Sequence, residues 1–300
     1  MTPVQLKAKV RNISREKQIE PHLVMRQYMM GKFLEQISES KYADNFVLKG
    51  GFLIESKYGI ENRTTKDLDT TLRDMRVMKE TVNNVFSDIT SAPTKEGISF
   101  EIRSIRETRE ADYYPGFSLG IRAQLENMRT DFSIDVTTGD TIYPDSVKHK
   151  HKLMFEDREI FIEAYPTEQI LAEKLSATFD FLTDNTRMKD FYDLYTIPKM
   201  EELNSAEDLK ESVRRTFTQR EKKERLKHYF EKDMNVIETS NELKKQWENY
   251  QKNNPFAEGI PYSDIVNSIK KLMSTVIQME ERDRKRDYKR SVQYQKEMER

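Results

Sequence analysis

The sequence predicts an α+β protein in which a mixed sheet with its own helices is followed by a helical C-terminal part. Three segments between residues 98 and 136 alternate apolar and polar residues with the period of a β-strand, which predicts an antiparallel meander. From Pro166 onward the apolar residues instead recur every three or four positions, as they do on the buried face of a helix. We therefore expect two domains, residues 1–165 with the sheet and residues 166–300 with helices.

Composition limits the class of protein. The chain has 300 residues, of which 36% are hydrophobic and 34% charged, and no apolar run approaches the roughly eighteen residues that span a bilayer. The first twenty residues carry charges throughout and lack the apolar core of a signal peptide. The absence of cysteine excludes disulfides, thiolate metal ligands and a cysteine nucleophile. We expect a cytoplasmic globular protein, and the net charge of -1 predicts no overall attraction to nucleic acid.

The first domain is expected to start with helix and continue with a short strand. Residues 1–40 have helical spacing, and residues 46–48 form a short apolar run typical of a buried strand. The pair Gly50-Gly51 follows, and residues 52–58 can begin a helix. Glycine lets the backbone approach a ligand closely, and the free amides of a helix N-terminus favour an anion such as phosphate.

Three carboxylates stand out on predicted strands. Asp67 and Asp69 are two residues apart, so their side chains project from the same side while Leu68 faces the other way. Two carboxylates that share a face repel each other unless a cation lies between them, and magnesium is the natural candidate. Asp135 lies on the polar side of the last alternating segment and supplies a third carboxylate, either as a metal ligand or as a general base.

The second domain adds a lysine and two further acids. Thr167 is expected to cap a helix on whose apolar stripe Lys174 lies, where an ammonium loses hydration unless it reaches an anion. The next helix brings Asp190 and Asp193 together, and Pro198 is expected to end it. Further features are the lone Trp247, expected in the core, and a break at 253–255.

Each candidate has a simpler structural interpretation. Asp67 and Asp69 can belong to a solvated strand face, Asp135 can accept a hydrogen bond on an exposed face, and Lys174 can extend to water. Asp190 and Asp193 can pair with Arg187 and Lys189. Residues 148–152, which alternate lysine and histidine, predict a solvated loop rather than a metal site, because the lysines repel a cation. The basic stretches 214–227 and 282–290 can bind RNA phosphate or form ordinary helix faces.

Four motifs in order resemble the AbiEii/AbiGii nucleotidyltransferase-like toxins of bacterial defence systems over about residues 20–200. They are Leu48-Lys49-Gly50-Gly51, Arg63 to Asp69, Ala172-Glu173-Lys174-Leu175 and Lys189-Asp190-Phe191-Tyr192-Asp193-Leu194. The resemblance implies a DNA polymerase β-like nucleotidyltransferase fold, a nucleoside triphosphate donor, Mg²⁺, transfer to RNA such as tRNA acceptor ends, and a neutralising antitoxin protein.

The resemblance also implies roles for particular residues. The nucleotide site would comprise Lys49, Gly50, Gly51, Arg63, Thr65 and Lys174, with Lys174 on the donor phosphates. Asp67 and Asp69 would hold the metal, and Asp190 would be a later essential acid. Many nucleotidyltransferases have serine where this chain has Gly51, and related toxins often have a small hydroxyl residue in place of Phe52.

The sequence therefore predicts a magnesium-dependent nucleotidyltransferase toxin of phage defence or a toxin-antitoxin system, with RNA as acceptor. One alternative is a catalytically silent protein of the same fold that holds a nucleotide or a partner, which the residues Gly51 and Phe52 favour. A second alternative is an enzyme that modifies protein instead of RNA.

Overall fold

The computed structural model describes residues 1–75, 78–108, 116–182, 187–219 and 226–298, and its chain divides into two compact units. The first consists of Met1–Asp140 with Ser146–Tyr165, and the second of Thr141–Asp145 with Pro166–Arg300. As functional domains, the ranges 1–165 and 166–300 stay a prediction. Among the helices that the structure describes, none has both the length and the apolar character needed to cross a bilayer.

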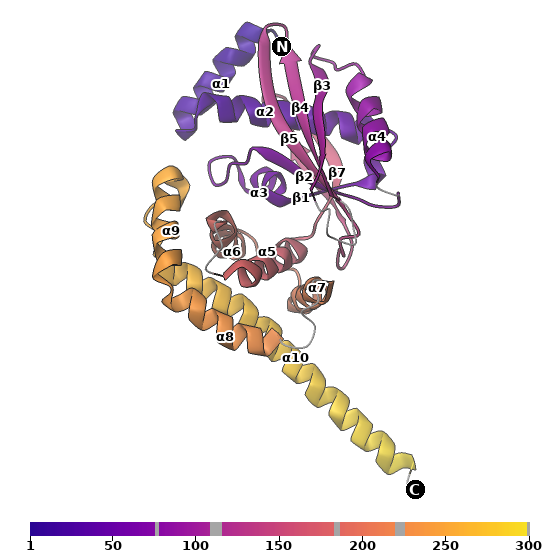
Figure 1. Ribbon diagram of the computed structural model, residues 1–300, viewed down its shortest axis with the longest axis vertical. Coiled ribbons are helices and arrows are strands. Elements are labelled where there is room, and N and C mark those ends of the chain that lie inside the picture. Colours follow the sequence, from indigo (N-terminus) through magenta and orange to yellow (C-terminus); the bar gives the residue numbers. More distant parts are fainter. Residues whose placement is uncertain (76–77, 109–115, 183–186, 220–225, 299–300) are drawn as a thin grey trace. The chain divides into compact units, whose positions relative to one another are not determined.

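The first unit is built on a seven-stranded mixed sheet (Figure 1), whose strand order is β3-β4-β5-β2-β1-β7-β6. Its strands are β1 (Phe46–Lys49), β2 (Asp67–Leu72), β3 (Ser99–Glu107), β4 (Gly116–Leu125), β5 (Met128–Thr138), β6 (Val147–Lys152) and β7 (Glu159–Ala164). The alternating segments form the antiparallel meander β3-β4-β5 that the sequence predicts. β5 then pairs in parallel with β2, and β1 pairs in parallel with β7, which makes the sheet mixed.

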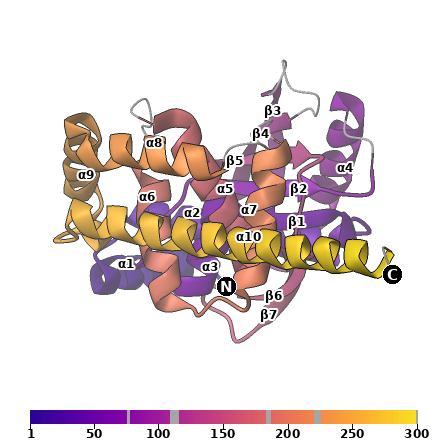
Figure 2. The same ribbon diagram turned by 90° about the horizontal axis from the view of Figure 1, so that it is seen from below.

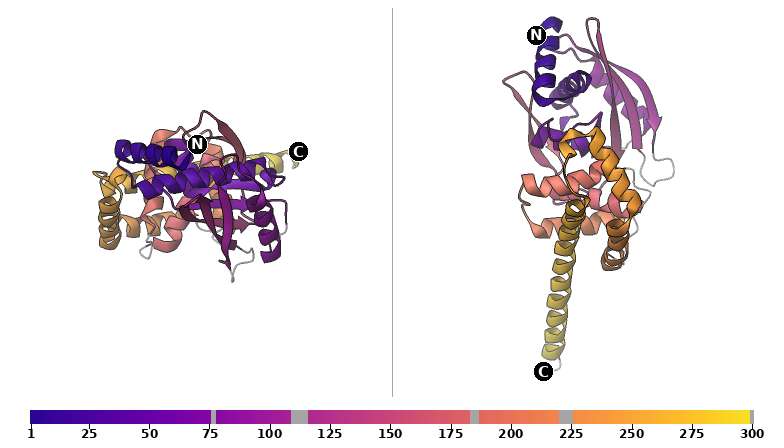
Figure 3. Two further views of the ribbon diagram at one scale, coloured as in Figure 1. Left: turned by 90° about the horizontal axis from the view of Figure 1, so that it is seen from above. Right: turned by 90° about the vertical axis from the view of Figure 1, so that its left-hand side faces the viewer.

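Helices cover the apolar face of this sheet (Figures 1 and 3). The first unit contains α1 (Pro3–Lys17), α2 (Pro21–Glu39), the short 3-10 helix η1 (Ala43–Asn45), α3 (Gly50–Tyr58) and α4 (Lys79–Ser91). Phe33 of α2 lies 5.0 Å from Phe100 of β3 and 5.9 Å from Phe132 of β5, measured between ring centroids. These rings are buried and join helix to sheet by the non-directional burial of apolar surface.

The stretch 1–40, expected to be helical, contains two helices instead of one. Gln18 has a left-handed backbone with φ 54°, and Pro21 stands at the start of α2. Proline has no N–H to continue a hydrogen-bond ladder from the preceding turn, so the second helix starts anew.

The second unit is helical, as the sequence predicts (Figure 2). It contains α5 (Thr167–Phe181), α6 (Met188–Met200), α7 (Ala206–Gln219), α8 (Leu226–Thr239), α9 (Asn241–Asn253), the 3-10 helix η3 (Pro255–Ala257) and α10 (Tyr262–Met298). α10 packs against α6, α7 and α8. Trp247 is buried, as expected, and donates from Nε1 to the Ile260 carbonyl oxygen at 2.9 Å.

Two expectations for this unit are wrong. Thr167 is not a helix cap: the capping position is Pro166, and the Thr167 hydroxyl donates to Glu201 instead. Pro198 does not end α6, which continues to Met200. A proline in a helix leaves the carbonyl four residues earlier without its N–H donor, and here the Ser268 hydroxyl donates to that carbonyl, of Leu194, at 2.8 Å.

Candidate functional site

Strand register brings the predicted carboxylates onto one face of the sheet. Asp69 of β2 is the direct partner of Asp135 on the parallel strand β5. Directly paired residues project from the same face, and Asp67, two residues before Asp69, shares that face. The intervening Leu68 and the neighbouring Ile134 are fully buried on the opposite face. The predicted separation of acidic and apolar sides along both strands is therefore confirmed.

The backbone turn at Gly50 and Gly51, here called the glycine bend, lies against the carboxylate of Asp69. Gly50 has φ +65°, and a Cβ atom placed on it would lie 1.9 Å from Asp69 Oδ2. Gly51, the next residue of α3, donates its N–H to the same Asp69 oxygen at 3.3 Å. A side chain at position 50 would thus be strained by the backbone and would displace the carboxylate. The sequence predicts that the amides after the glycine pair bind phosphate, whereas in this structure the Gly51 N–H binds the Asp69 carboxylate.

The segment before β2 packs closely on this bend. A Cβ atom on Gly51 would lie 2.8 Å from Thr65 Oγ1 and 3.2 Å from Nη2 of Arg63. Arg63 and Thr65 are both buried, and the Thr65 hydroxyl donates to Asp67 Oδ1. Of the predicted nucleotide-binding residues, Gly50, Gly51, Arg63 and Thr65 therefore form one contiguous cluster around Asp67 and Asp69.

Lys49 has a buried anionic partner. It is paired with Asp69 in the register of β1 and β2, but its ammonium lies 2.5 Å from Asp140 Oδ2 and donates to Thr137 Oγ1 at 2.7 Å. Only 7% of Lys49 is exposed. The Asp140 carboxylate offsets the charge that burial would otherwise make costly. The role of Lys49 as a nucleotide contact stays a prediction.

The donor types fit a magnesium ion, since carboxylate oxygens are the ligands it prefers. Asp69 and Asp135 are neighbours across the strand pair, and Asp67 lies two residues along β2 on the same face. Within the described ranges, no three histidine, aspartate or glutamate side chains are already gathered around one point as a metal would require. The backbone thus places suitable ligands side by side, while Asp67 and Asp69 are turned to Thr65 and Gly51.

The second unit brings together the other three predicted side chains. Lys174 of α5 places its ammonium 2.8 Å from Asp190 Oδ1 and 2.7 Å from Asp193 Oδ2, both on α6. Arg187 also binds Asp190, at 2.8 Å. Burial opposes ionisation of Asp190, but the charges of Lys174 and Arg187 hold the pKa of its carboxyl below the usual value. The expected anion for Lys174 is therefore, within this unit, an aspartate pair.

The histidines of residues 148–152 lie on a strand, so the expected loop is wrong. β6 pairs with β7, and His149 and His151 both contact Ser56 Oγ of α3 at 2.7 Å. Burial, and to a smaller extent the neighbouring His149, lowers the pKa of His151 to about 4. The lysines that alternate with these histidines point to the other side of the strand, which the alternation of strand side chains explains.

The basic stretches are only partly described. In the first, Arg214 and Arg215 bind Glu211 on their own helix, and residues 220–225 lie outside the described residues, as does the side chain of Lys227. In the second, the basic side chains are exposed on α10, and Arg286 pairs with Asp283 at 3.1 Å. A role of either stretch in RNA binding stays a prediction.

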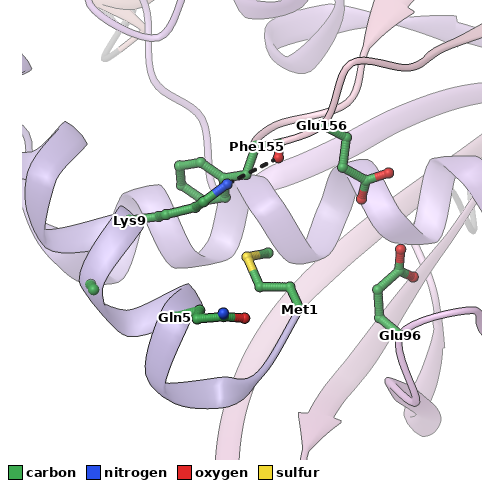
Figure 4. Close-up of a pocket in the computed structure, with 7 residues that line it drawn as sticks. Met1, Gln5, Lys9, Glu96, Phe155 and Glu156 are labelled. Atoms are coloured by element: carbon green, nitrogen blue, oxygen red, sulfur yellow. Dashed lines mark hydrogen bonds between the residues drawn. The ribbon is translucent and has the colours of Figure 1, made fainter.

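A pocket in the first unit has a volume of about 440 Å³ and is drawn in Figure 4. It is lined by Met1, Gln5, Ala8, Lys9, Glu96, Phe155 and Glu156. Lys9 donates to the Phe155 carbonyl oxygen at 3.3 Å across it. The lining contains none of the predicted site residues.

Three residues near the carboxylates are not among the site residues that the sequence predicts. Glu55 and Gln27 both bind Thr65, and Asp140 binds Lys49. A signal existed for Glu55, because it follows the apolar run Phe52-Leu53-Ile54 and so falls where a helix is buried. No local pattern distinguishes Gln27 or Asp140.

The mixed sheet carries paired carboxylates beside a glycine bend, and a comparison with protein families gives the class of protein, the nucleotidyltransferases. The family described as nucleotidyl transferase AbiEii toxin, type IV TA system, matches residues 32–268. The chain belongs to this family. The resemblance noted in the sequence and the predicted α+β fold are confirmed.

A comparison with solved structures finds three that match this chain at low sequence identity. A proposed nucleotidyltransferase from H. pylori is 14% identical, with a TM-score of 0.44 and coverage of 86% of this chain and 96% of that one. JHP933 from Helicobacter pylori is 13% identical, with a TM-score of 0.45 and coverage of 90% and 98%. An antigenic nucleotidyltransferase-like protein from Paracoccidioides brasiliensis is 11% identical, with a TM-score of 0.35 and coverage of 82% and 92%. No curated protein matches the sequence.

Proposed function

We propose that this nucleotidyltransferase is a magnesium-dependent toxin that transfers a nucleotide from a nucleoside triphosphate to RNA, with tRNA as the acceptor. The observation that carries the proposal is the pairing of Asp69 with Asp135 beside the Gly50 bend. Nucleotidyl transfer needs little covalent chemistry from side chains, so positioned negative ligands and close backbone approach are the features to expect.

Asp69, Asp135 and Asp67 would hold magnesium on the shared face of β2 and β5. When bound, the ion supplies positive charge that stabilises the oxygens of the transferring phosphoryl group. The protein positions both ligands. Because Gly50 has no Cβ atom, the Asp69 carboxylate can occupy the space beside it, and the Thr65 hydroxyl orients Asp67. Asp135 can serve there as a metal ligand or as a general base.

The remaining parts of the proposal follow from family membership and from charge. Lys174 would contact the donor phosphates, and Asp190, which lies 2.8 Å from the Lys174 ammonium, would act as a further essential acid. A cognate antitoxin protein would neutralise the toxin in the cytoplasm, and defence against phage would be the setting, in keeping with a type IV toxin-antitoxin family.

The test uses purified protein, magnesium, total RNA and each of the four triphosphates labelled at the α-phosphate. We expect label transfer to RNA, lost in Asp69→Asn and in Asp135→Asn. Asp131→Asn is the matched control, because Asp131 lies on the same strand but is exposed and paired with Arg122 at 2.8 Å. Equal transfer by Asp69→Asn and the wild type would refute this site.

A second candidate function is supported by the contact between Gly51 N–H and Asp69, since that amide is engaged by the protein itself. In this case the protein binds a triphosphate without turnover. Binding measured by calorimetry with no label transfer would favour it. Ribonuclease treatment before electrophoresis separates the remaining alternative: label on RNA disappears, whereas label on a modified protein remains.

A further inference from the structure

Thr65 is held by three hydrogen bonds in the first unit. Its backbone N–H donates to Glu55 Oε2 at 3.3 Å, and its carbonyl accepts from Gln27 Nε2 at 2.9 Å. Its hydroxyl donates to Asp67 Oδ1. With both backbone groups fixed, the side chain has a fixed origin, and the hydroxyl is directed at one carboxylate oxygen.

Glu55 and Gln27 are both buried, with 7% and 3% of their surfaces exposed, and their side chains contact each other. Gln27 Oε1 is buried and, in the part of the chain that the structure describes, has no hydrogen-bond partner. Burial raises the pKa of the Glu55 carboxyl well above its usual value, against the opposing effects of the Thr65 N–H, of Arg63 and of the hydrogen bond from the Gln27 side chain.

Both carboxylates of β2 are thereby tied to one helix. At the start of α3 the Gly51 N–H binds Asp69, and one turn later Glu55 binds Thr65, which binds Asp67. A helix is a rigid element, so α3 fixes the spacing of the two contacts. Gln27 adds a brace from α2, a different element of the core.

We propose that Glu55 and Gln27 are positioning residues that orient the Asp67 carboxylate through Thr65. The inference rests on the proposed function, in which Asp67 is a metal ligand. Residues that hydrogen-bond to metal ligands set the ligand's orientation, and their loss commonly weakens metal affinity about 10–100-fold. Thr65 is such a partner of Asp67, and Glu55 and Gln27 fix the backbone of Thr65.

The test measures binding of Mn²⁺, a paramagnetic stand-in for Mg²⁺, to the full chain by electron paramagnetic resonance, with label transfer as a second measurement. Glu55→Leu removes both hydrogen bonds with little change in volume, and we expect Mn²⁺ affinity to fall about tenfold or more. Glu55→Gln keeps an acceptor for Thr65 and gives Gln27 an N–H donor, so its Mn²⁺ affinity should stay within about threefold of the wild type.

Glu35→Leu is the matched control for the loss of a buried glutamate. Glu35 lies on α2 and is 5% exposed, and its carboxylate binds Lys32 and Arg158 rather than Thr65. This variant is expected to lower the unfolding temperature while leaving Mn²⁺ affinity unchanged. A merely structural role for Glu55 would give Glu35→Leu and Glu55→Leu the same profile.

Thr65→Val keeps the test decisive if Glu55→Leu fails to fold, because it removes only the hydroxyl. We expect it to weaken Mn²⁺ binding as much as Glu55→Leu, and the double variant to lose no more than either single one. Wild-type affinity in folded Glu55→Leu or in Thr65→Val overturns the positioning role. Absence of Mn²⁺ binding by the wild type overturns the proposed metal function itself, which is a separate result.

Discussion

Gly50 and Asp69 occupy adjoining space so closely that a single methyl group on Gly50 would overlap the Asp69 carboxylate, at 1.9 Å from Oδ2. The glycine is therefore needed for two reasons, its positive φ and the carboxylate beside it. This relationship links the glycine bend to the acidic strand, although Gly50 and Asp69 are nineteen residues apart in the sequence.

We predict that Gly50→Ala lowers nucleotide transfer about 100-fold or more, because displacement of a reacting-centre ligand by about 1 Å has effects of that size. The measurement is kcat/KM for the transferred nucleotide. Gly97→Ala is the matched control: Gly97 also has positive φ, +73°, but nothing lies within 4 Å of its added Cβ. It should lose about 1 kcal/mol of stability from backbone strain and keep its activity. Similar activity in both variants would show that the carboxylate tolerates displacement.

Lys174 is expected to be essential for the stability of the second unit. Lys174→Met would leave Asp190 and Asp193, both with 1% side-chain exposure, without their shared cation. Removing one member of a buried ionic group costs about 3–5 kcal/mol. Urea unfolding measures this loss, and Lys252→Met, at an exposed lysine of α9, should change stability by less than about 0.5 kcal/mol.

Stability and activity can be separated at this position. In the double variant Lys174→Met with Asp193→Asn, removal of one buried charge should restore part of the lost stability. If Lys174 also contacts donor phosphates, the KM for the triphosphate stays high despite the recovered stability. Recovery of both quantities together would restrict Lys174 to a structural role.

His151 should make the protein less stable as the pH is lowered. Its pKa is lowered from 6.5 to about 4 in the folded protein, so the unfolded chain binds the proton first on acidification. Stability is therefore lost between about pH 6.5 and about pH 4, by an amount on the order of 1–3 kcal/mol. Thermal unfolding at several pH values measures the slope.

His151→Asn keeps a polar partner for Ser56 but cannot titrate, and we expect a flatter dependence of the unfolding temperature on pH in this window. His22→Asn, at an exposed histidine of α2, is the control and should keep the wild-type slope. An unchanged slope in His151→Asn would mean that other groups cause the acid sensitivity.

Ser268 is expected to stabilise α6 by replacing the donor that Pro198 lacks. Ser268→Ala leaves the Leu194 carbonyl without this hydroxyl and should cost about 1–2 kcal/mol. In a Pro198→Ala background the new backbone N–H can serve the same carbonyl, so the cost of Ser268→Ala should fall by about 1 kcal/mol. A double-mutant cycle by urea unfolding gives this coupling energy, and additive effects of the two changes would contradict the compensation.

Local sequence patterns predicted many of the strands and helices. The alternation around Phe132 and Ile134 predicted the meander, and the apolar run at residues 46–48 predicted β1, because strand side chains alternate whatever the rest of the chain does. The expectation of a loop for the segment with His149 and His151 is wrong. Its lysines make the segment as polar as a loop, but the histidines lie on the less exposed side of a strand. Pro198 failed as a stop signal because the compensating donor lies seventy residues further along the chain.

The candidate site divides in the same way. The sequence alone determined that Asp67 and Asp69 share a face and that a glycine bend precedes them, because strand pleat and backbone freedom are properties of neighbouring residues. Only the tertiary structure decided that β5 lies beside β2, so that Asp135 meets Asp69, and that Glu55 and Gln27 converge on Thr65. Strand order and buried hydrogen bonds depend on partners distant in the chain, whose meeting is set by the packing of the whole core.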